Sequence, residues 1–132
     1  MDNEELLSLA QEARGFSIAA ISNFKVGAAL LTKSGKVFLG CNIEDPSGIG
    51  VTNICAERCA IVKALSEGHR DFVKIAVAGG IDKLIFCTPC GVCRQYMNTF
   101  CPDIKVVCMA DDGALVEYAL NDLLPYSFSE KF

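Results

Sequence analysis

Hydrophobic and polar positions in the first third of the chain follow a helical period and then a strand period. Between residue 2 and about residue 20, apolar side chains recur at helical spacing among acidic ones, which predicts an amphipathic opening helix. Two apolar runs of β type, FKVGAALLT (24–32) and VFLGCNIE (37–44), flank the short turn KSGK. This pattern predicts a β-hairpin.

The remainder of the chain predicts alternating helices and strands. The stretch DPSGIGVTN (45–53) contains a proline and two glycines, so it predicts a loop that leads into a helix from about Ile54 to Glu67. The following segments predict, in order, two buried strands, a turn entering a helix, two further strands and a short terminal helix: 72–80, 84–88, 89–100, 104–110, 114–120 and 121–128.

This order of elements combines a hairpin with β-α-β crossovers. It favours an α/β fold, a three-layer sandwich of helices around a mixed sheet. The chain has no internal repeat and no linker-like tract, so we expect residues 1–132 to form a single domain.

Composition and charge exclude several classes of partner. The chain of 132 residues is 52% hydrophobic and 21% charged, which argues against disorder, and its formal net charge of -4 offers no basic surface. Nucleic acid and anionic membranes are therefore not expected as partners. The acidic N-terminus and the lack of a long apolar run predict a cytoplasmic protein. In that reducing compartment, eight cysteines are more often metal ligands or core residues than half-cystines.

A C-x-x-C pair, Cys90 and Cys93, lies at a predicted helix start directly after Pro89. On spacing alone it indicates half of a structural zinc site, a redox pair or an accidental pattern. Cys55 is a third candidate ligand at a second predicted helix start. Three cysteine ligands would leave the fourth zinc position open, which is typical of a catalytic site.

Charged residues next to these cysteines have candidate roles. Glu57 could serve as the base and acid beside the metal, although residues two apart lie about 200° apart around a helix and converge only in its first turn. Arg58 and Arg94 could offset the negative charge of three thiolates around Zn²⁺, or they could lie on solvated helix faces. Packing in the core is expected for the other cysteines: Cys41, Cys59, Cys87, Cys101 and Cys108. His69 is expected at the surface or at a helix end.

At these residues the chain resembles a known family. CAER together with PCGVCRQ is similar to the zinc-dependent cytidine deaminases, specifically the small homotetrameric class with three cysteine ligands. NFKVGAALLT, GCNIE and LLPYSF also resemble family segments and occur in the family order. The resemblance implies a cytidine deaminase-like three-layer α-β-α sandwich with a five-stranded mixed sheet, one Zn²⁺ per subunit, and active sites shared between the subunits of a homotetramer.

The resemblance also implies roles for individual residues. Cys55, Cys90 and Cys93 would hold zinc, and Glu57 would move protons from the activated water to the pyrimidine ring and then to the departing ammonia. Arg58 would compensate the thiolate charge. The nucleoside would be held by the following residues, the last of them contributed by a neighbouring subunit: Phe24, Asn42, Glu44, the backbone of Ala56, and Phe128.

The resulting hypothesis is zinc-dependent hydrolysis of cytidine and 2'-deoxycytidine to uridine and 2'-deoxyuridine plus ammonia, a reaction of pyrimidine salvage. The stretch DPSGIGVTNI departs from the family because it is longer and lacks an aromatic residue. This departure motivates an alternative substrate, a modified cytosine nucleoside such as a blasticidin S-like antibiotic. Another alternative is a non-catalytic structural zinc or thiol-redox protein, which would give Glu57 no role.

Overall fold

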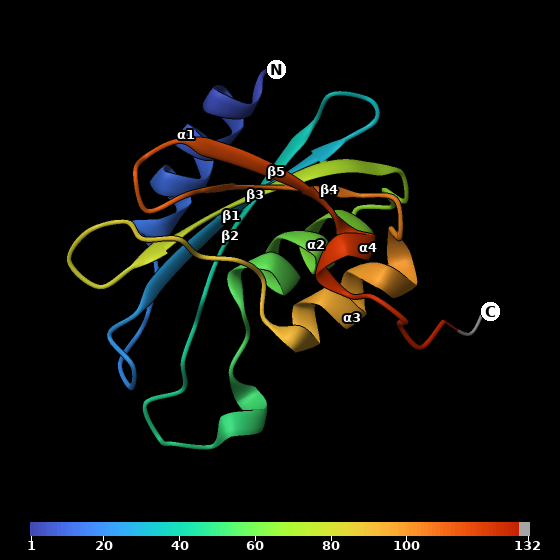
Figure 1. Ribbon diagram of the computed structural model, residues 1–132. Helices are drawn as coiled ribbons and strands as arrows, with labels where there is room; N and C mark the ends of the chain where they lie inside the picture. The colour runs from blue at the N-terminus through green and yellow to red at the C-terminus, as the bar shows by residue number, and fades with distance from the viewer. Residues whose placement is uncertain (130–132) are drawn as a thin grey trace.

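A five-stranded mixed sheet lies between two helical layers in the computed structural model, which describes residues 1–129 (Figure 1). The strands are β1 (Lys25–Thr32), β2 (Val37–Cys41), β3 (Phe72–Gly80), β4 (Lys105–Met109) and β5 (Leu115–Ala119). The helices are α1 (Asn3–Arg14), α2 (Ala56–Ser66), α3 (Gly91–Phe100) and α4 (Leu120–Leu123), with a 3-10 turn, η1 (Gly50–Thr52). None of the helices within residues 1–129 is long and apolar enough to span a membrane.

The strand order is β2-β1-β3-β4-β5. Strands β3 and β4 pair in parallel through the crossover helix α3, whereas the other neighbouring strands pair antiparallel. The predicted α/β sandwich around a mixed sheet is therefore confirmed. Helix α1 covers one face of the sheet, and α2 and α3 lie side by side on the other (Figure 1).

Alternation along the strands divides the core between the two faces. Ala28 and Leu30 of β1 belong to the cluster that packs against α2 and α3, whereas Ala29 between them belongs to the cluster under α1. In β4, Val106 and Val107 divide in the same way. This period of two explains why the central strands are apolar without interruption: both faces of the sheet are covered.

Helix α1 is shorter than predicted, because it ends at Arg14 and not near residue 20. It begins with a capping box between Asp2 and Glu5, and the backbone N–H of Gly15 caps its last turn. The chain then runs beside the end of β2, where the N–H of Ile18 donates to the carbonyl of Asn42 at 3.1 Å. These residues pair with the polar end of the strand and do not continue the helix. Residues 17–24 therefore lie at one end of the sheet.

Residues 84–88 do not form the strand that their composition predicts. They make a single bridge, Ile85 with Gly79. Strand β1 pairs with β3 along its whole length, whereas β4 pairs with it only at residues 74–76, so Ile85 meets Gly79 on the edge that β4 leaves free, and the pairing goes no further. The segment instead carries the chain to Cys90.

Two glycines set how closely helices approach the sheet. A Cβ at Gly27 would lie 1.9 Å from the carbonyl oxygen of Ala10 in α1. A Cβ at Gly40 would lie 2.4 Å from the carbonyl oxygen of Ala56 and 2.5 Å from the backbone nitrogen of Ala60. The first turn of α2 therefore rests directly on the backbone of β2.

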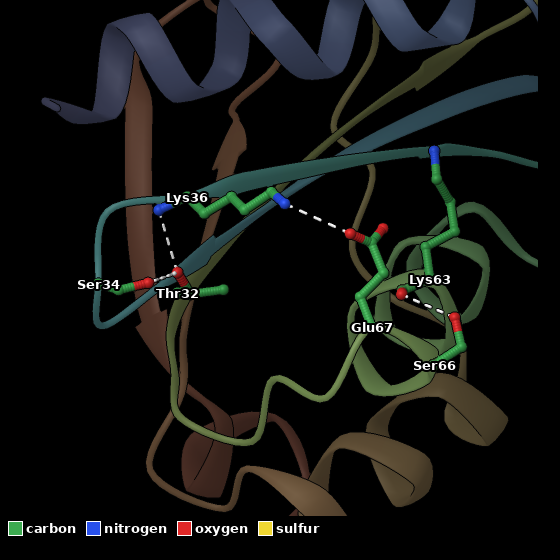
Figure 2. A network of polar contacts seen from close by, with 6 residues as sticks. All are labelled: Thr32, Ser34, Lys36, Lys63, Ser66 and Glu67. Atoms are coloured by element: carbon green, nitrogen blue, oxygen red, sulfur yellow. Dashed lines mark hydrogen bonds and ion pairs between the residues drawn. The ribbon is translucent and has the colours of Figure 1, made fainter.

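The other end of α2 is joined to the β1–β2 turn by polar contacts (Figure 2). Lys36 forms an ion pair with Glu67 at 3.3 Å, and the Lys63 ammonium donates to the carbonyl of Leu39 in β2. In the turn itself, Thr32 Oγ1 lies 2.9 Å from Ser34 Oγ and accepts from the N–H of Lys36. Exposed ion pairs contribute little stability, so we assign this network a role in aligning α2 with the hairpin.

Candidate active site

The candidate ligands Cys55 and Cys90 occupy equivalent places at the starts of two helices. Cys55 is the N-cap of α2 with φ -78° and ψ 155°, and Cys90 is the N-cap of α3 with φ -67° and ψ 167°. Cys93 lies in the first turn of α3, and its N–H donates to the Cys90 sulfur at 3.4 Å. The N-terminus of α3 therefore directs an N–H group toward the Cys90 sulfur, an environment that favours a thiolate, whereas no backbone N–H of α2 caps the Cys55 side chain.

The three sulfurs form a set that fits a zinc ion. They lie within 4.8 Å of one another, and the Sγ atoms of Cys55 and Cys90 are 3.6 Å apart. Tetrahedral zinc with bonds of about 2.3 Å requires sulfurs roughly 3.8 Å apart. A hydrogen bond from the Cys93 thiol lowers the pKa of Cys55, and contacts with Arg58 act in the same direction, while the same hydrogen bond raises the pKa of Cys93. The spacing of the sulfurs and the Cys55 thiolate together suit a soft divalent cation.

Glu57 meets the condition for convergence with Cys55. Because Cys55 is an extended N-cap outside the helix and Glu57 lies in the first turn, the ideal helical divergence does not apply. The Glu57 side chain is buried, with 4% relative exposure, and burial raises its pKa to about 7, with a further contribution from the Cys55 thiolate. A carboxyl group with this pKa can both accept and release a proton near neutral pH.

Arg58 and Arg94 have different hydrogen-bond partners. Arg58 Nη2 lies 3.8 Å from the Cys55 sulfur, while its Nε is buried and finds no hydrogen-bond partner within residues 1–129. Arg94 hydrogen-bonds to Thr88, Pro89 and Leu123, so it neither contacts a sulfur nor lies on a solvated helix face. Both interpretations offered for Arg94 from the sequence are therefore wrong.

A cavity of about 380 Å³ brings most of the predicted residues together. Its lining includes the following predicted residues: Phe24, Asn42, Glu44, Cys55, Ala56, Glu57, Arg58 and Cys90. Cys93 is fully buried behind it. Asn53, Cys87 and Thr88 also line the cavity, although the sequence predicted no role in the site for them.

Asn42 and Glu44 organise the segment that borders this cavity. Asn42 donates to the carbonyl of Phe24 at 2.8 Å and accepts from the N–H of Val26 and the hydroxyl of Ser17. Glu44 accepts from the N–H groups of Ile21 and Ser22, both at 2.9 Å. Each side chain keeps hydrogen-bonding capacity beyond these contacts: one N–H of Asn42 and one lone pair of Glu44 Oε2.

The side chains of Phe24 and Cys87 share the space above Gly79. A Cβ at Gly79 would lie 2.7 Å from Cys87 Sγ and 3.0 Å from Phe24 Cε1. Cys87 was expected in the core, but it is half-buried and faces the cavity, whereas Cys101 and Cys108 are buried as predicted. Proximity to Cys90 in the sequence was the available signal for Cys87.

Phe128 lies outside the cavity and is 72% exposed. Its carbonyl accepts hydrogen bonds from Gln95 Nε2 at 3.0 Å and from Asn98 Nδ2 at 3.2 Å. The C-terminal segment is thus held against α3, which carries the zinc ligand Cys93. The aromatic ring of Phe128 is exposed to solvent in the isolated chain.

The unusual stretch 45–54 forms the predicted loop and projects away from the sheet and helices (Figure 1). Asp45 accepts from the N–H of Ser47 and from the hydroxyl of Thr52, and its own N–H donates to Asn53 Oδ1 at 2.6 Å. Within this ordered loop Val51 is 93% exposed. The loop therefore has a defined internal structure and an apolar tip.

The chain is similar to proteins of known family. Residues 1–110 match the family model for the cytidine and deoxycytidylate deaminase zinc-binding region. The chain is 45% identical to a cytidine deaminase of Halalkalibacterium halodurans over 98% of this chain and 96% of that protein. The crystal structure of cytidine deaminase from Burkholderia pseudomallei has a TM-score of 0.87 and 41% identity, covering 97% of this chain and all of that one. A blasticidin-S deaminase of Bacillus cereus is 34% identical over 79% of this chain and 76% of that protein.

These matches agree with the geometry of the sulfurs, which identifies Cys55, Cys90 and Cys93 as the zinc-binding triad. Homology at 41 to 45% identity over nearly the whole chain shows cytidine deaminase activity. The chain belongs to the family of small zinc-dependent cytidine deaminases.

Proposed function

We propose that the chain hydrolyses both cytidine and 2'-deoxycytidine, with Glu57 as the catalytic acid and base. The observation that carries this proposal is the buried Glu57 carboxyl group, which shares one cavity with two of the zinc ligands, Cys55 and Cys90, and with the polar pair Asn42 and Glu44. Zinc bound by the three sulfurs supplies Lewis-acid activation of a water molecule. The remaining work is proton transfer and placement of the nucleoside.

Glu57 performs the proton transfers. It takes a proton from the attacking water and delivers it to the ring nitrogen beside C4, as oxygen adds to C4. It then moves the second proton to the exocyclic nitrogen, the C4–N bond breaks and ammonia leaves. Burial disfavours the charged form of the Glu57 carboxyl group and raises its pKa, which helps it to hold a proton between the two transfers.

Arg58 offsets the charge of the triad. Three thiolates around Zn²⁺ have a net charge of -1, which makes activation of the water harder. The guanidinium lies 3.8 Å from the Cys55 sulfur, and the free N–H at its buried Nε is available to a second acceptor. A hydrogen bond from Arg58 withdraws electron density from the sulfur and supports activation of the water.

The polar residues of the cavity orient the nucleoside. Glu44 and the free N–H of Asn42 bind the ribose hydroxyls, and Phe24 packs against the nucleoside. The N–H of Ala56, at the first position of α2, holds the polar edge of the pyrimidine. These assignments give each cavity residue the kind of contact that its functional group can make.

The direct test is a purified, zinc-analysed preparation assayed for the fall in cytidine's ultraviolet absorbance. Cytidine and 2'-deoxycytidine are both expected to be converted, with release of ammonia. Failure with 2'-deoxycytidine alone would restrict the proposal to ribonucleosides.

The projecting loop 45–54 and the 34% identical blasticidin-S deaminase support a second candidate substrate, a modified cytosine nucleoside. Retention of Asn42 and Glu44 in the cavity favours the unmodified nucleosides. Competition between cytidine and blasticidin S in one assay separates the two. The substrate consumed first at equal concentration identifies the preferred class.

We also propose that the chain assembles as a homotetramer in the cytoplasm, with Phe128 entering the cavity of a neighbouring subunit. The Phe128 ring is exposed, its backbone is held by α3 outside its own cavity, and none of the eight cysteines forms a disulfide within residues 1–129, which is compatible with a reducing compartment. Light scattering at low concentration tests the assembly. A stable monomer with full activity contradicts it.

A further inference from the structure

Arg94 directly follows the zinc ligand Cys93 and connects three separate parts of the chain. Its Nε donates to the Pro89 carbonyl at 2.7 Å, its Nη2 to Thr88 Oγ1 at 2.9 Å, and its Nη1 to the Leu123 carbonyl at 2.7 Å. All three guanidinium nitrogens are therefore engaged. The acceptors lie in the segment before α3 and at the end of α4.

The Pro89 carbonyl has particular importance because it belongs to the peptide group that enters Cys90. A peptide group is planar, so a hydrogen bond to this carbonyl orients the whole plane up to the Cα of Cys90. The backbone N–H of Arg94 donates to the carbonyl of Cys90 at 2.9 Å. One residue thus holds both peptide planes that flank this zinc ligand.

Holding both planes restricts the φ and ψ of Cys90, the two soft torsions that determine where its Cβ and sulfur point. Cys90 needs this restraint because it is the exposed member of the triad, whereas Cys55 is half-buried and Cys93 is fully buried. Pro89, just before it, is buried and contributes a rigid start. The position of the Cys90 sulfur therefore depends on hydrogen bonds more than on packing.

We propose that Arg94 is a positioning residue of the zinc site, which holds Cys90 in its ligating conformation and anchors it to the end of α4. This inference rests on the zinc triad, and its effect on turnover rests on the function proposed above. The role requires arginine, because a planar fork with donors on three nitrogens reaches three acceptors that a lysine ammonium on its flexible chain cannot satisfy together. A charge effect alone would be retained by lysine.

The test compares zinc-loaded, full-length wild type with Arg94→Lys, Arg94→Met and Thr88→Val. Arg70→Met is the matched control, because Arg70 also donates to two backbone carbonyls, those of Leu65 and His69. The first readout is the rate of zinc transfer to a chromogenic chelator without substrate. The second is the thiolate-to-metal absorption of the cobalt-substituted protein.

We expect Arg94→Met to release zinc about 10- to 100-fold faster, on the scale of lost interactions around metal ligands. Arg94→Lys should also release zinc faster, and its cobalt spectrum should be altered. Thr88→Val, which removes one acceptor, should show a smaller acceleration, and Arg70→Met should match wild type.

Wild-type release rates and cobalt spectra in folded Arg94→Lys and Thr88→Val would overturn the proposal, even if Arg94→Met does not fold. A wild-type zinc release rate and cobalt spectrum in Arg94→Lys, with faster release in Arg94→Met, would also overturn the proposal. A positive charge at this position would then be enough to hold the site. Neither readout requires turnover, so inactivity of the wild type toward cytidine would refute the proposed function and leave this inference standing.

Discussion

The hydroxyl of Ser22 donates to Glu44 Oε2 at 2.6 Å and accepts from the N–H of Phe24 at 3.0 Å. One side chain thus joins the carboxylate proposed to bind ribose to the aromatic residue beside it. The Ser22 hydroxyl is also the main cause of the lowered pKa of Glu44. Ser22 therefore holds the Glu44 carboxylate in place and favours its charged form, a role that no pattern in the sequence indicated.

For Ser22→Ala we expect KM for cytidine to rise about fivefold with kcat within twofold of wild type, because binding loses a contribution of about 1 kcal/mol. The Glu44 pKa should rise toward its ordinary value. Initial-rate kinetics measure the first effect. Ser66→Ala serves as the control, because its hydroxyl contacts the Lys63 carbonyl away from the cavity (Figure 2). An unchanged KM would show that Ser22 does not orient Glu44 for binding.

Glu57→Gln removes proton transfer while keeping the size of the side chain. We expect kcat to fall by ~10²-fold or more with zinc content unchanged. Glu67→Gln, at the other end of α2 and paired with Lys36, should have near wild-type activity. Metal analysis and kcat are measured on the same preparation. Wild-type kcat in Glu57→Gln would remove this residue from the mechanism.

The raised pKa of Glu57 has a consequence for the stability of the metal-free protein. Between pH 4.5, its ordinary pKa, and about pH 7, the folded protein holds a proton on Glu57 that the unfolded chain has lost. The contribution of Glu57 to stability is therefore full below pH 4.5 and lost as pH rises to about 7.

Relative to metal-free Glu57→Gln, the metal-free wild type should lose roughly 3 kcal/mol across this range. Urea unfolding at several pH values measures the difference. A difference that does not change with pH would mean that burial does not raise the pKa of Glu57.

Gly40→Ala tests the close packing of α2 against β2. The added Cβ would lie 2.4 Å from the Ala56 carbonyl oxygen, so the first turn of α2 must move. We expect a loss of stability of about 3 kcal/mol or more, together with lower activity, because Ala56 and Glu57 move with that turn. Gly50→Ala is the control for stability, because a Cβ there meets no atom within 4 Å. Equal unfolding free energies for the two variants would contradict the close packing.

The sequence was most informative where one local signal sufficed. The starts of α2 and α3, the hairpin and the C-x-x-C turn follow from short patterns, so Cys55, Cys90 and Cys93 could be named as candidate ligands before any geometry was known. Gly15 also signals the end of α1 at Arg14, but helical periodicity beyond it masked that signal.

Tertiary structure decided the properties that depend on partners distant in the chain. Residues 84–88 have a strand-like composition, yet they make only one bridge, Ile85 with Gly79, at the end of β3 that β4 leaves unpaired. Arg94 was ambiguous because its acceptor at Leu123 lies 29 residues away. Cys87 was predicted to lie in the core because it follows an apolar run. The sequence could not show that Gly79, which lacks a side chain, leaves room for the side chains of Cys87 and Phe24.

The sequence by itself indicated three candidate sulfur donors and a carboxylate at helix starts, and the resemblance to the deaminase family gave these residues their roles as zinc ligands and proton carrier. Only the tertiary structure decided the pKa of the Glu57 carboxyl group and the contacts that hold the zinc ligands in place. Burial raises the pKa of Glu57, and hydrogen bonds from Arg94 hold Cys90. Both effects depend on desolvation and on contacts between segments that folding alone brings together.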